Sequence, residues 1–339
     1  MDGWRVSDEQ LEGWLVSLLD GTRRVVAPVA EDGLTLFREV TSADEIRLAT
    51  RHPRTRLPAK ETLLPATEVL FSYRLEAGGV ALEVPPQPSD QVVIGLRPCD
   101  AAGTARLDEV LLADSHYADR RRRTALVTVA CTSAGPACFC TAVGGSPGGT
   151  EAADLQVVPL QGSWLVRPLT DQGTTLVAGS AEGWPEASDE DWMAAEGQRR
   201  AVEATITTEP IPSEWVRGLA ERFDAPAWQA LAERCLGCGL CAYVCPSCAC
   251  FDISDAGGAL CGSRCRTWDS CGFRQFTVHA GGYNPRPSHL ARHRQRVLHK
   301  FAWFPLEHGA LMCVGCGRCV ELCPAGIDIR QSVVRVMSG

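Results

Sequence analysis

Long apolar runs are missing from this sequence, because no stretch approaches the roughly 18 to 20 uninterrupted apolar residues that a membrane-spanning helix needs. Basic residues are not in excess either. The chain of 339 residues has a formal net charge of −8, which argues against a nucleic-acid-binding protein. Its first residues, MDGWRVSDEQLEGW, are acidic and lack the basic and apolar regions of a signal peptide. We therefore expect a cytoplasmic protein with no membrane segment and no nucleic-acid partner.

Nucleotide-binding motifs are missing as well. No G-x-G-x-x-G follows a predicted strand, no G-x-x-x-x-G-K-[ST] loop is present, and no flavin motif is visible. Beyond its cysteines, the first half of the chain shows no nucleophile, base or cofactor-binding loop that would form a catalytic site. We therefore expect no catalytic residues and no substrate site, although whether the chain is an enzyme by itself stays open.

Cysteine, by contrast, is abundant and unevenly distributed. Seventeen cysteines are an odd number in a chain without an export signal, so metal binding explains them better than a disulfide framework does. Four lie in the first half, and the other thirteen lie between Cys235 and Cys323. The stretch 178–225 contains none and is rich in Glu, Ala, Ser, Trp and Pro. We place a domain boundary near its end, which predicts one domain at 1–225 and a second at 226–339.

The first domain has the periodicities of mixed α and β structure. Apolar residues at helical spacing predict a helix over 8–20, with Gly21 as its C-cap. Asp100 can N-cap a second helix over 101–113. Short apolar runs of strand length stand at 91–96, 124–130, 153–160, 163–168 and 173–178. This order predicts a βαβ-like unit followed by a small antiparallel set.

The second domain contains the strongest motif of the chain, a cysteine run that occurs twice. The copies are Cys235-Leu-Gly-Cys238-Gly-Leu-Cys241-Ala-Tyr-Val-Cys245-Pro246 and Cys313-Val-Gly-Cys316-Gly-Arg-Cys319-Val-Glu-Leu-Cys323-Pro324. Three thiolates at this spacing can wrap one face of a 4Fe-4S cubane, and the glycines let the backbone approach the cluster. Zinc is the alternative, but zinc sites do not need a third cysteine and a Cys-Pro in each run.

The repeated run predicts two 4Fe-4S clusters with crossed ligands. In two-cluster ferredoxins the fourth cysteine of each run binds the cluster of the other run. One predicted ligand set is therefore Cys235, Cys238, Cys241 and Cys323. The other predicted set is Cys313, Cys316, Cys319 and Cys245. The predicted fold class is accordingly α+β, with a mixed α/β first domain followed by a two-cluster ferredoxin-like domain that carries a long insertion.

The four upstream cysteines suggest a third iron–sulfur site, of the 4Fe-4S type. Cys99 stands at a predicted strand-to-helix turn, where a helix N-terminus favours a thiolate. Cys131 ends a buried strand, and Cys138 and Cys140 follow on a loop. Because strand ends and loops at one edge of a sheet can converge, we predict that these four bind a cluster together. The alternatives are ordinary buried cysteines or a zinc site.

Further segments carry a resemblance to a known family. They are Arg97-Pro98-Cys99-Asp100, Cys138-Phe139-Cys140, Pro246-Ser247-Cys248-Ala249-Cys250-Phe251-Asp252, Trp268-Asp269-Ser270-Cys271-Gly272-Phe273, Gly282-Tyr283-Asn284-Pro285-Arg286 and His299-Lys300-Phe301. Together with the two runs, they resemble the beta subunit of cytoplasmic nickel–iron hydrogenases and sulfhydrogenases, and similarly the A subunit of anaerobic sulfite reductase. The resemblance spans about residues 55–335.

The resemblance implies an electron relay within a hetero-oligomer. Electrons would pass between a subunit that binds a flavin and NAD(P)H and the nickel–iron hydrogenase small and large subunits. The paired Cys-x2-Cys sites that a nickel–iron centre needs are not present here as such. The alternatives are an electron-transfer subunit of anaerobic sulfite reductase or another multi-subunit oxidoreductase, a self-contained iron–sulfur oxidoreductase, and a protein that uses clusters only as structural supports.

The role of two further groups of residues stays open. Five cysteines lie outside the sets above: Cys248, Cys250, Cys261, Cys265 and Cys271. They are either small buried side chains or a further metal site, and we favour the first. The basic stretch from Arg286 to Lys300 is either a solvated helix face or a source of positive charge for an acidic partner or a cluster.

Overall fold

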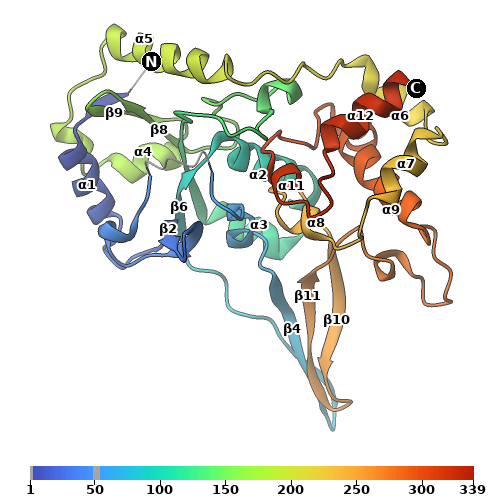
Figure 1. Cartoon of the computed structure of the whole chain (residues 1–339). Helices are drawn as coiled ribbons and strands as arrows, with labels where there is room; N and C mark the ends of the chain where they lie inside the picture. The colour runs from blue at the N-terminus through green and yellow to red at the C-terminus, as the bar shows by residue number, and fades with distance from the viewer. Residues whose placement is uncertain (1–2, 49–53) are drawn as a thin grey trace.

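A seven-stranded mixed sheet forms the first part of the computed structural model, which describes residues 3–48 and 54–339 (Figure 1). The strand order is β1-β9-β8-β7-β6-β2-β3. The strands are β1 (Trp4–Val6), β2 (Arg24–Glu31), β3 (Leu34–Glu39), β6 (Gln91–Leu96), β7 (Thr124–Val129), β8 (Leu155–Leu160) and β9 (Ser163–Pro168). The helices beside them are α1 (Asp8–Ser17), α2 (Pro98–Leu111), α3 (Ser115–Arg122), α4 (Asp171–Val177) and α5 (Asp189–Glu203).

The centre of this sheet is the predicted βαβ unit, which is confirmed. Every residue of β6 and β7 is buried, as expected for parallel strands that are covered on both faces. On one face, Val92 and Ile94 pack in a core cluster with Trp14 of α1. On the other face, Val93 packs with Leu126 in a separate cluster. The carboxyl ends of β6 and β7 therefore lie side by side, next to Cys99 and Cys131.

Three predicted elements differ from the structure. The helix predicted over 8–20 ends at Ser17, with Leu18 rather than Gly21 as its C-cap. The helix predicted over 101–113 begins at Pro98, with Arg97 rather than Asp100 as its N-cap, because proline suits the first helical position. The strand predicted at 173–178 is wrong, since this segment belongs to helix α4. The Thr170 side chain caps α4 by accepting a hydrogen bond from the Gly173 backbone. A run of six apolar and small residues fits a strand or a buried helix equally well. Here the Thr170 cap favours the helix.

The C-terminal part is helical around the cysteine runs (Figure 1). Its helices are α6 (Glu214–Glu221), α7 (Ala227–Glu233), α8 (Leu240–Tyr243), α9 (His289–Leu298), the π-helix η6 (His299–Trp303), α10 (Phe304–His308), α11 (Arg318–Glu321) and α12 (Ile329–Ser338). A core that includes Trp228, Phe301 and Val333 holds these helices together. An N-terminal mixed sheet followed by this cysteine-run region confirms the predicted fold class.

Short 3-10 helices complete the secondary structure: η1 (Ala43–Glu45), η2 (Ala59–Thr62), η3 (Cys140–Val143), η4 (Ala181–Gly183) and η5 (Gln275–Thr277). None of the helices in the described ranges is both long and apolar enough to cross a membrane.

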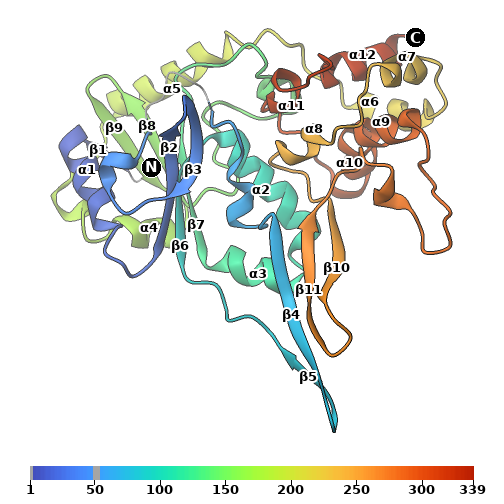
Figure 2. The ribbon, with the colours of Figure 1, turned by 60° about the horizontal axis from the view of Figure 1, so that its bottom comes forward.

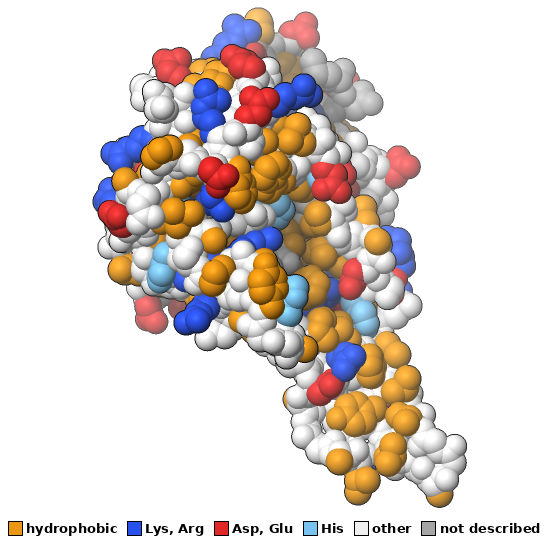
Figure 3. All heavy atoms as spheres, turned by 90° about the vertical axis from the view of Figure 1, so that its right-hand side faces the viewer, with side chains coloured by type: hydrophobic (Ala, Val, Ile, Leu, Met, Phe, Trp, Pro, Cys, Tyr) orange, Lys and Arg blue, Asp and Glu red, His pale blue; other side chains and the backbone are white. Residues whose placement is uncertain are grey.

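A four-stranded antiparallel sheet projects from the body as an arm (Figures 1 and 2). Its order is β10-β11-β4-β5, with β4 (Thr67–Glu76), β5 (Gly79–Glu83), β10 (Phe251–Gly257) and β11 (Cys261–Trp268). Strand β4 pairs with β11, so the arm joins segments from both sides of the boundary that the sequence predicts near residue 225. Hydrophobic side chains gather on the arm in Figure 3, and Val80 and Leu82 are 58% and 64% exposed.

Candidate iron–sulfur sites

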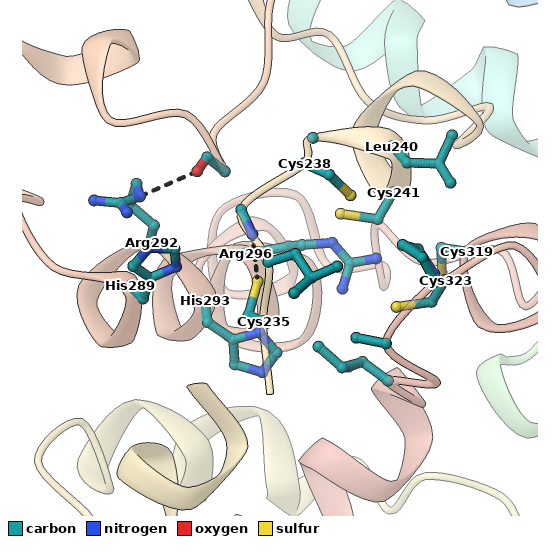
Figure 4. Close-up of a pocket in the computed structure, with 17 residues that line it drawn as sticks. Cys235, Cys238, Leu240, Cys241, His289, Arg292, His293, Arg296, Cys319 and Cys323 are labelled. Atoms are coloured by element: carbon teal, nitrogen blue, oxygen red, sulfur yellow. Dashed lines mark hydrogen bonds between the residues drawn. The ribbon is translucent and has the colours of Figure 1, made fainter. Parts of the chain in front are cut away.

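The first cysteine run lines a cavity that the second run also reaches (Figure 4). Gly237 and Gly239 adopt positive φ angles of 66° and 75°, which fold the run into a tight loop. The cysteines around this cavity are Cys235, Cys238, Cys241, Cys319 and Cys323. The structure therefore brings one predicted ligand set to a single cavity, together with Cys319 from the other set.

Helix α9 supplies buried positive charge to this cavity. In Figure 4 the Arg296 side chain extends from α9 toward the cysteine sulfurs. Arg296 is only 8% exposed, and its Nε has no hydrogen-bond partner among the described residues. Burial opposes its charge, but neighbouring thiolates, those of Cys241 and Cys319 foremost, together outweigh burial and raise the pKa of Arg296. Burial lowers the pKa of the adjacent His293 to about 4, so this imidazole is neutral near pH 7.

The second run gathers around Cys245. Cys245, Cys313 and Cys316 are all buried, and the charge of Cys245 acts on both of the others. The ammonium of Lys300 is 3% exposed, and its Nζ lies 3.3 Å from Cys245 Sγ and 3.2 Å from Ser247 Oγ. Since Cys319 acts electrostatically on Cys313 and on Cys241, the two predicted ligand sets are direct neighbours.

The solvated-face reading of the basic stretch is therefore wrong for its central residues. Arg292, His293, Arg296 and Lys300 are buried against the cysteine loops. The Nε of Arg292 donates to the Gly272 carbonyl, as Figure 4 shows, and this bond ties α9 to the loop after β11. The structure places the positive charge inside the molecule, beside the cysteines.

The four upstream cysteines also come together. Cys99, Cys131, Cys138 and Cys140 line one cavity, which Cys316 of the second run also lines. Cys99 lies at the start of α2, and Cys131 follows β7, so the parallel strand pair places both at one edge of the sheet. Arg54 donates from Nη1 to Cys138 Sγ at 3.2 Å. This group is the one that the sequence predicts, and a metal at it remains a prediction.

Glycines of the second run fit it closely against this upstream loop. A Cβ at Gly317 would lie 2.1 Å from the Ala137 carbonyl oxygen, and one at Gly315 would lie 2.5 Å from the Cys140 backbone. The Phe139 N–H also donates to the Gly315 carbonyl at 2.8 Å. These glycines therefore allow the upstream loop at Ala137 and Cys140 to pack directly against the second run. From the sequence, we expect only that they let the backbone approach a cluster.

A buried ion pair holds the same junction. Arg318, inside the second run, donates from Nη1 to Asp100 Oδ1 at 2.6 Å and from Nη2 to Oδ2 at 3.1 Å. The side chains of Arg318 and Asp100 are 1% and 2% exposed. Arg318 also donates to the Thr55 carbonyl and hydroxyl, so its buried charge is well satisfied. The pair fixes the second run against the start of α2.

The chemistry of the thiols fits iron–sulfur clusters. Burial raises the pKa of Cys131 to about 11 and the pKa of Cys140 and of Cys313 to about 12. Such thiols stay protonated near neutral pH unless a metal takes the place of the proton. The cysteines surround cavities, and no group of three or more Cys, His, Asp or Glu side chains in the described ranges is arranged to hold a single metal ion.

The structure divides the five remaining cysteines into two groups. Cys261 and Cys265 lie on β11 in the arm, and Cys261 is exposed. Cys248, Cys250 and Cys271 line a separate cavity that Arg296 and Lys300 also reach. The idea that Cys261 and Cys265 join the other three is therefore not supported.

Some residues that shape these sites were not predicted. Lys60, 5% exposed, donates from Nζ to the carbonyls of Ala242 and Cys248. Nothing in its sequence neighbourhood signals this position. Arg318 lies between Cys316 and Cys319, which could have drawn attention to it, but its partner Asp100 is distant in sequence.

Comparisons with known proteins agree with this arrangement. Residues 234–327 match the model of a family described as a 4Fe-4S dicluster domain. Over 326 residues, the chain is 32% identical to sulfhydrogenase 2 subunit beta of Pyrococcus furiosus, and the match covers 93% of each chain. The dicluster match implies two 4Fe-4S clusters within the two cysteine runs.

Proposed function

The chain belongs to the family of sulfhydrogenase beta subunits, and we propose that it is the iron–sulfur electron-transfer subunit of a sulfhydrogenase-like complex. The observation that carries the proposal is the continuity of the three cysteine groups. Cys316 lines the cavity of the upstream group and is close enough to Cys245 for their charges to interact, and Cys319 is likewise close to both Cys313 and Cys241. When bound, 4Fe-4S clusters accept and release single electrons.

The protein's own residues would hold and tune this relay. We propose that Cys235, Cys238, Cys241 and Cys323 bind one cluster, that Cys313, Cys316, Cys319 and Cys245 bind the second, and that Cys99, Cys131, Cys138 and Cys140 bind a third. The cations of Lys300 and Arg296 would offset the negative charge of the first two. Cys245, Cys313 and Cys316 are buried, which excludes water and lowers the dielectric around the second site, whereas Cys238 at the first site is exposed.

The partners would stand at the two ends of this row of sites. We propose a subunit that binds a flavin and NAD(P)H at one end and the nickel–iron hydrogenase small and large subunits at the other, in a cytoplasmic hetero-oligomer. The Pyrococcus furiosus relative is named as a beta subunit, which supports the existence of further subunits. The anaerobic sulfite reductase reading has no observation in its favour beyond the resemblance of the sequence.

The experiment that tests the proposal is gentle purification of the chain from its own host, followed by mass spectrometry of what accompanies it. We expect a nickel–iron large subunit and a flavin-binding subunit in stoichiometric amounts. A sirohaem-containing partner set would move the assignment to sulfite reduction. A stoichiometric monomer that turns over a substrate unaided would contradict the relay role altogether.

Spectroscopy gives a separate test of the relay itself. Because Cys319 of one predicted ligand set lines the cavity of the other, we expect magnetic coupling between the reduced clusters in electron paramagnetic resonance spectra. Two uncoupled signals would contradict this arrangement.

A further inference from the structure

Three cysteines outside the dicluster runs converge on one cavity at the base of the arm. Cys248 follows the Cys245-Pro246 turn, Cys250 lies just before β10, and Cys271 lies in the loop after β11. Cys250 and Cys271 are close enough to shift each other's pKa, and Cys250 also acts on Cys248, so the three thiols are neighbours around this cavity, with Cys248 next to Cys245 as well. Three separate segments of chain therefore bring three thiols to one place.

The space beside these thiols is not filled by protein. The cavity measures about 440 Å³, and its walls include apolar side chains such as Leu111 and Met312. The cavity opens to solvent on one side, where the partly exposed Val110 lines it. It therefore leaves room beside the three thiols for a bound group the size of a cluster.

Buried positive charge faces the same cavity. Lys300 and Arg296 both line it, and they are 3% and 8% exposed. Neither forms an ion pair with a carboxylate in the described part of the chain, and the Nε of Arg296 has no hydrogen-bond partner there. Buried cations favour anions nearby, so these two side chains, which also face the cysteine runs, suit an anionic occupant of this cavity.

We propose that Cys248, Cys250 and Cys271 bind a further iron–sulfur cluster in this cavity, distinct from the two clusters of the cysteine runs and from the upstream cysteine group. A cluster held by thiolates is anionic and bulky, and it matches both the cations and the empty space. The three thiols supply three of the four ligands that a cubane takes. Its fourth iron would face the cavity, which His299 also lines.

The backbone around His299 supports a functional site here. Residues His299–Trp303 form a π-helix, a rare element that recurs at functional sites. It continues directly from α9 and places His299 and Lys300 at the cavity. Arg296, which points toward the sulfurs in Figure 4, also lines the cavity at the base of the arm, so this one side chain contacts both cavities.

The arm provides matched controls for a test. Cys261 and Cys265 are cysteines of the same insertion that do not line the cavity. We compare the triple variant C248S/C250S/C271S with the double variant C261S/C265S, both as the full chain loaded with iron and sulfide under anaerobic conditions. The readouts are iron, zinc and acid-labile sulfide per chain.

We expect the triple variant to lose about four irons per chain relative to the wild type, while the double variant loses none. The coupled signals of the two clusters in the cysteine runs should persist in both. Equal iron in the two variants overturns the proposal, and so does the loss of one zinc ion instead of iron. A Cys250–Cys271 disulfide found in the iron-loaded wild type also overturns it.

Should the triple variant fail to fold, Cys271→Ala leaves two of the three thiols in place and gives the same readout. Unchanged iron in this variant overturns the proposal. Because iron content is measured on the chain alone, this outcome is independent of which subunits accompany it and therefore of the relay role.

Discussion

At the scale of single residues, buried charges carry most of the information about these sites. Arg296 lacks a hydrogen-bond partner at Nε among the described residues, yet its environment favours the charged form because cysteine thiolates surround it. Lys300 contacts a predicted cluster ligand directly. Such cations act on a cluster through space, so their removal should change its reduction potential more than its binding.

Replacing Arg296 tests this electrostatic role. We expect Arg296→Gln to lower the reduction potential of the cluster at Cys235, Cys238 and Cys241, since a positive charge nearby favours the reduced, more negative state. A loss on the order of 50–100 mV is reasonable for one charge at this range. Potentiometric titration followed by electron paramagnetic resonance measures it. Arg294→Gln is the control, because Arg294 on the same helix contacts Phe223 and Asp224 instead.

The Asp100–Arg318 pair gives a stability prediction. Asp100→Asn would leave the Arg318 guanidinium buried without its carboxylate, which typically costs roughly 3–5 kcal/mol. Anaerobic denaturation of the iron-loaded protein measures this free energy of unfolding. Asp90→Asn is the control, because the Asp90–Arg123 pair is largely exposed and should contribute less than about 1 kcal/mol. Similar losses in the two variants would contradict a structural role for the buried pair.

At the scale of elements, spacing in the sequence predicted some features and not others. The cysteine runs and the strands of the βαβ unit were predictable, because their patterns are local. The meeting of Cys99 with Cys131 followed from the parallel strands that precede them. The pairing of β4 with β11 was not predictable, because the strands come from distant segments and their polar residues hide the period of two. The strand expected at 173–178 was wrong because a run of six residues also fits a short helix, and Thr170 caps such a helix here.

The junction between the second run and the upstream loop can be tested with two glycines. Gly317 and Gly309 have φ angles of 76° and 77°, but only Gly317 faces backbone, at Ala137. We expect Gly309→Ala to cost about 1–2 kcal/mol for its backbone conformation alone. Gly317→Ala has the same cost in backbone conformation and also forces the second cysteine run away from the upstream loop at Ala137. The iron content of this variant should therefore fall. Iron per chain and the midpoint of unfolding measure these effects. Equal values for the two variants would contradict a close fit between the second run and the upstream loop.

At the scale of the whole molecule, the two halves are bound to each other in several places. The β4–β11 pairing, the Asp100–Arg318 pair and the contact of Phe139 with Gly315 all cross from the first part of the chain to the last. Cysteine distribution alone suggested a boundary near 225, but it carries no information about contacts between distant segments. A small ferredoxin, by contrast, binds its clusters without such support.

A fragment containing residues 226–339 should therefore bind iron–sulfur clusters less completely than the full chain does. Without the first part, β11 loses its partner β4 and Arg318 loses Asp100. We expect the fragment to hold fewer irons per chain than the cysteine runs of the full chain, and to unfold without a cooperative transition. Iron analysis and circular dichroism, with the full chain as control, measure both. A fragment with about eight irons and cooperative unfolding would show that the runs fold independently.

The arm also bears on how the protein is made. Val80, Leu82, Val84 and Leu260 are each more than half exposed, which is unusual for a surface that stays in water. In the proposed complex another subunit could cover them. A newly synthesised chain waiting for that subunit would be prone to stick to other chains and to be degraded, so its lifetime in the cell would depend on coordinated production of the two. Expression alone in a foreign host should accordingly yield less intact protein than co-expression.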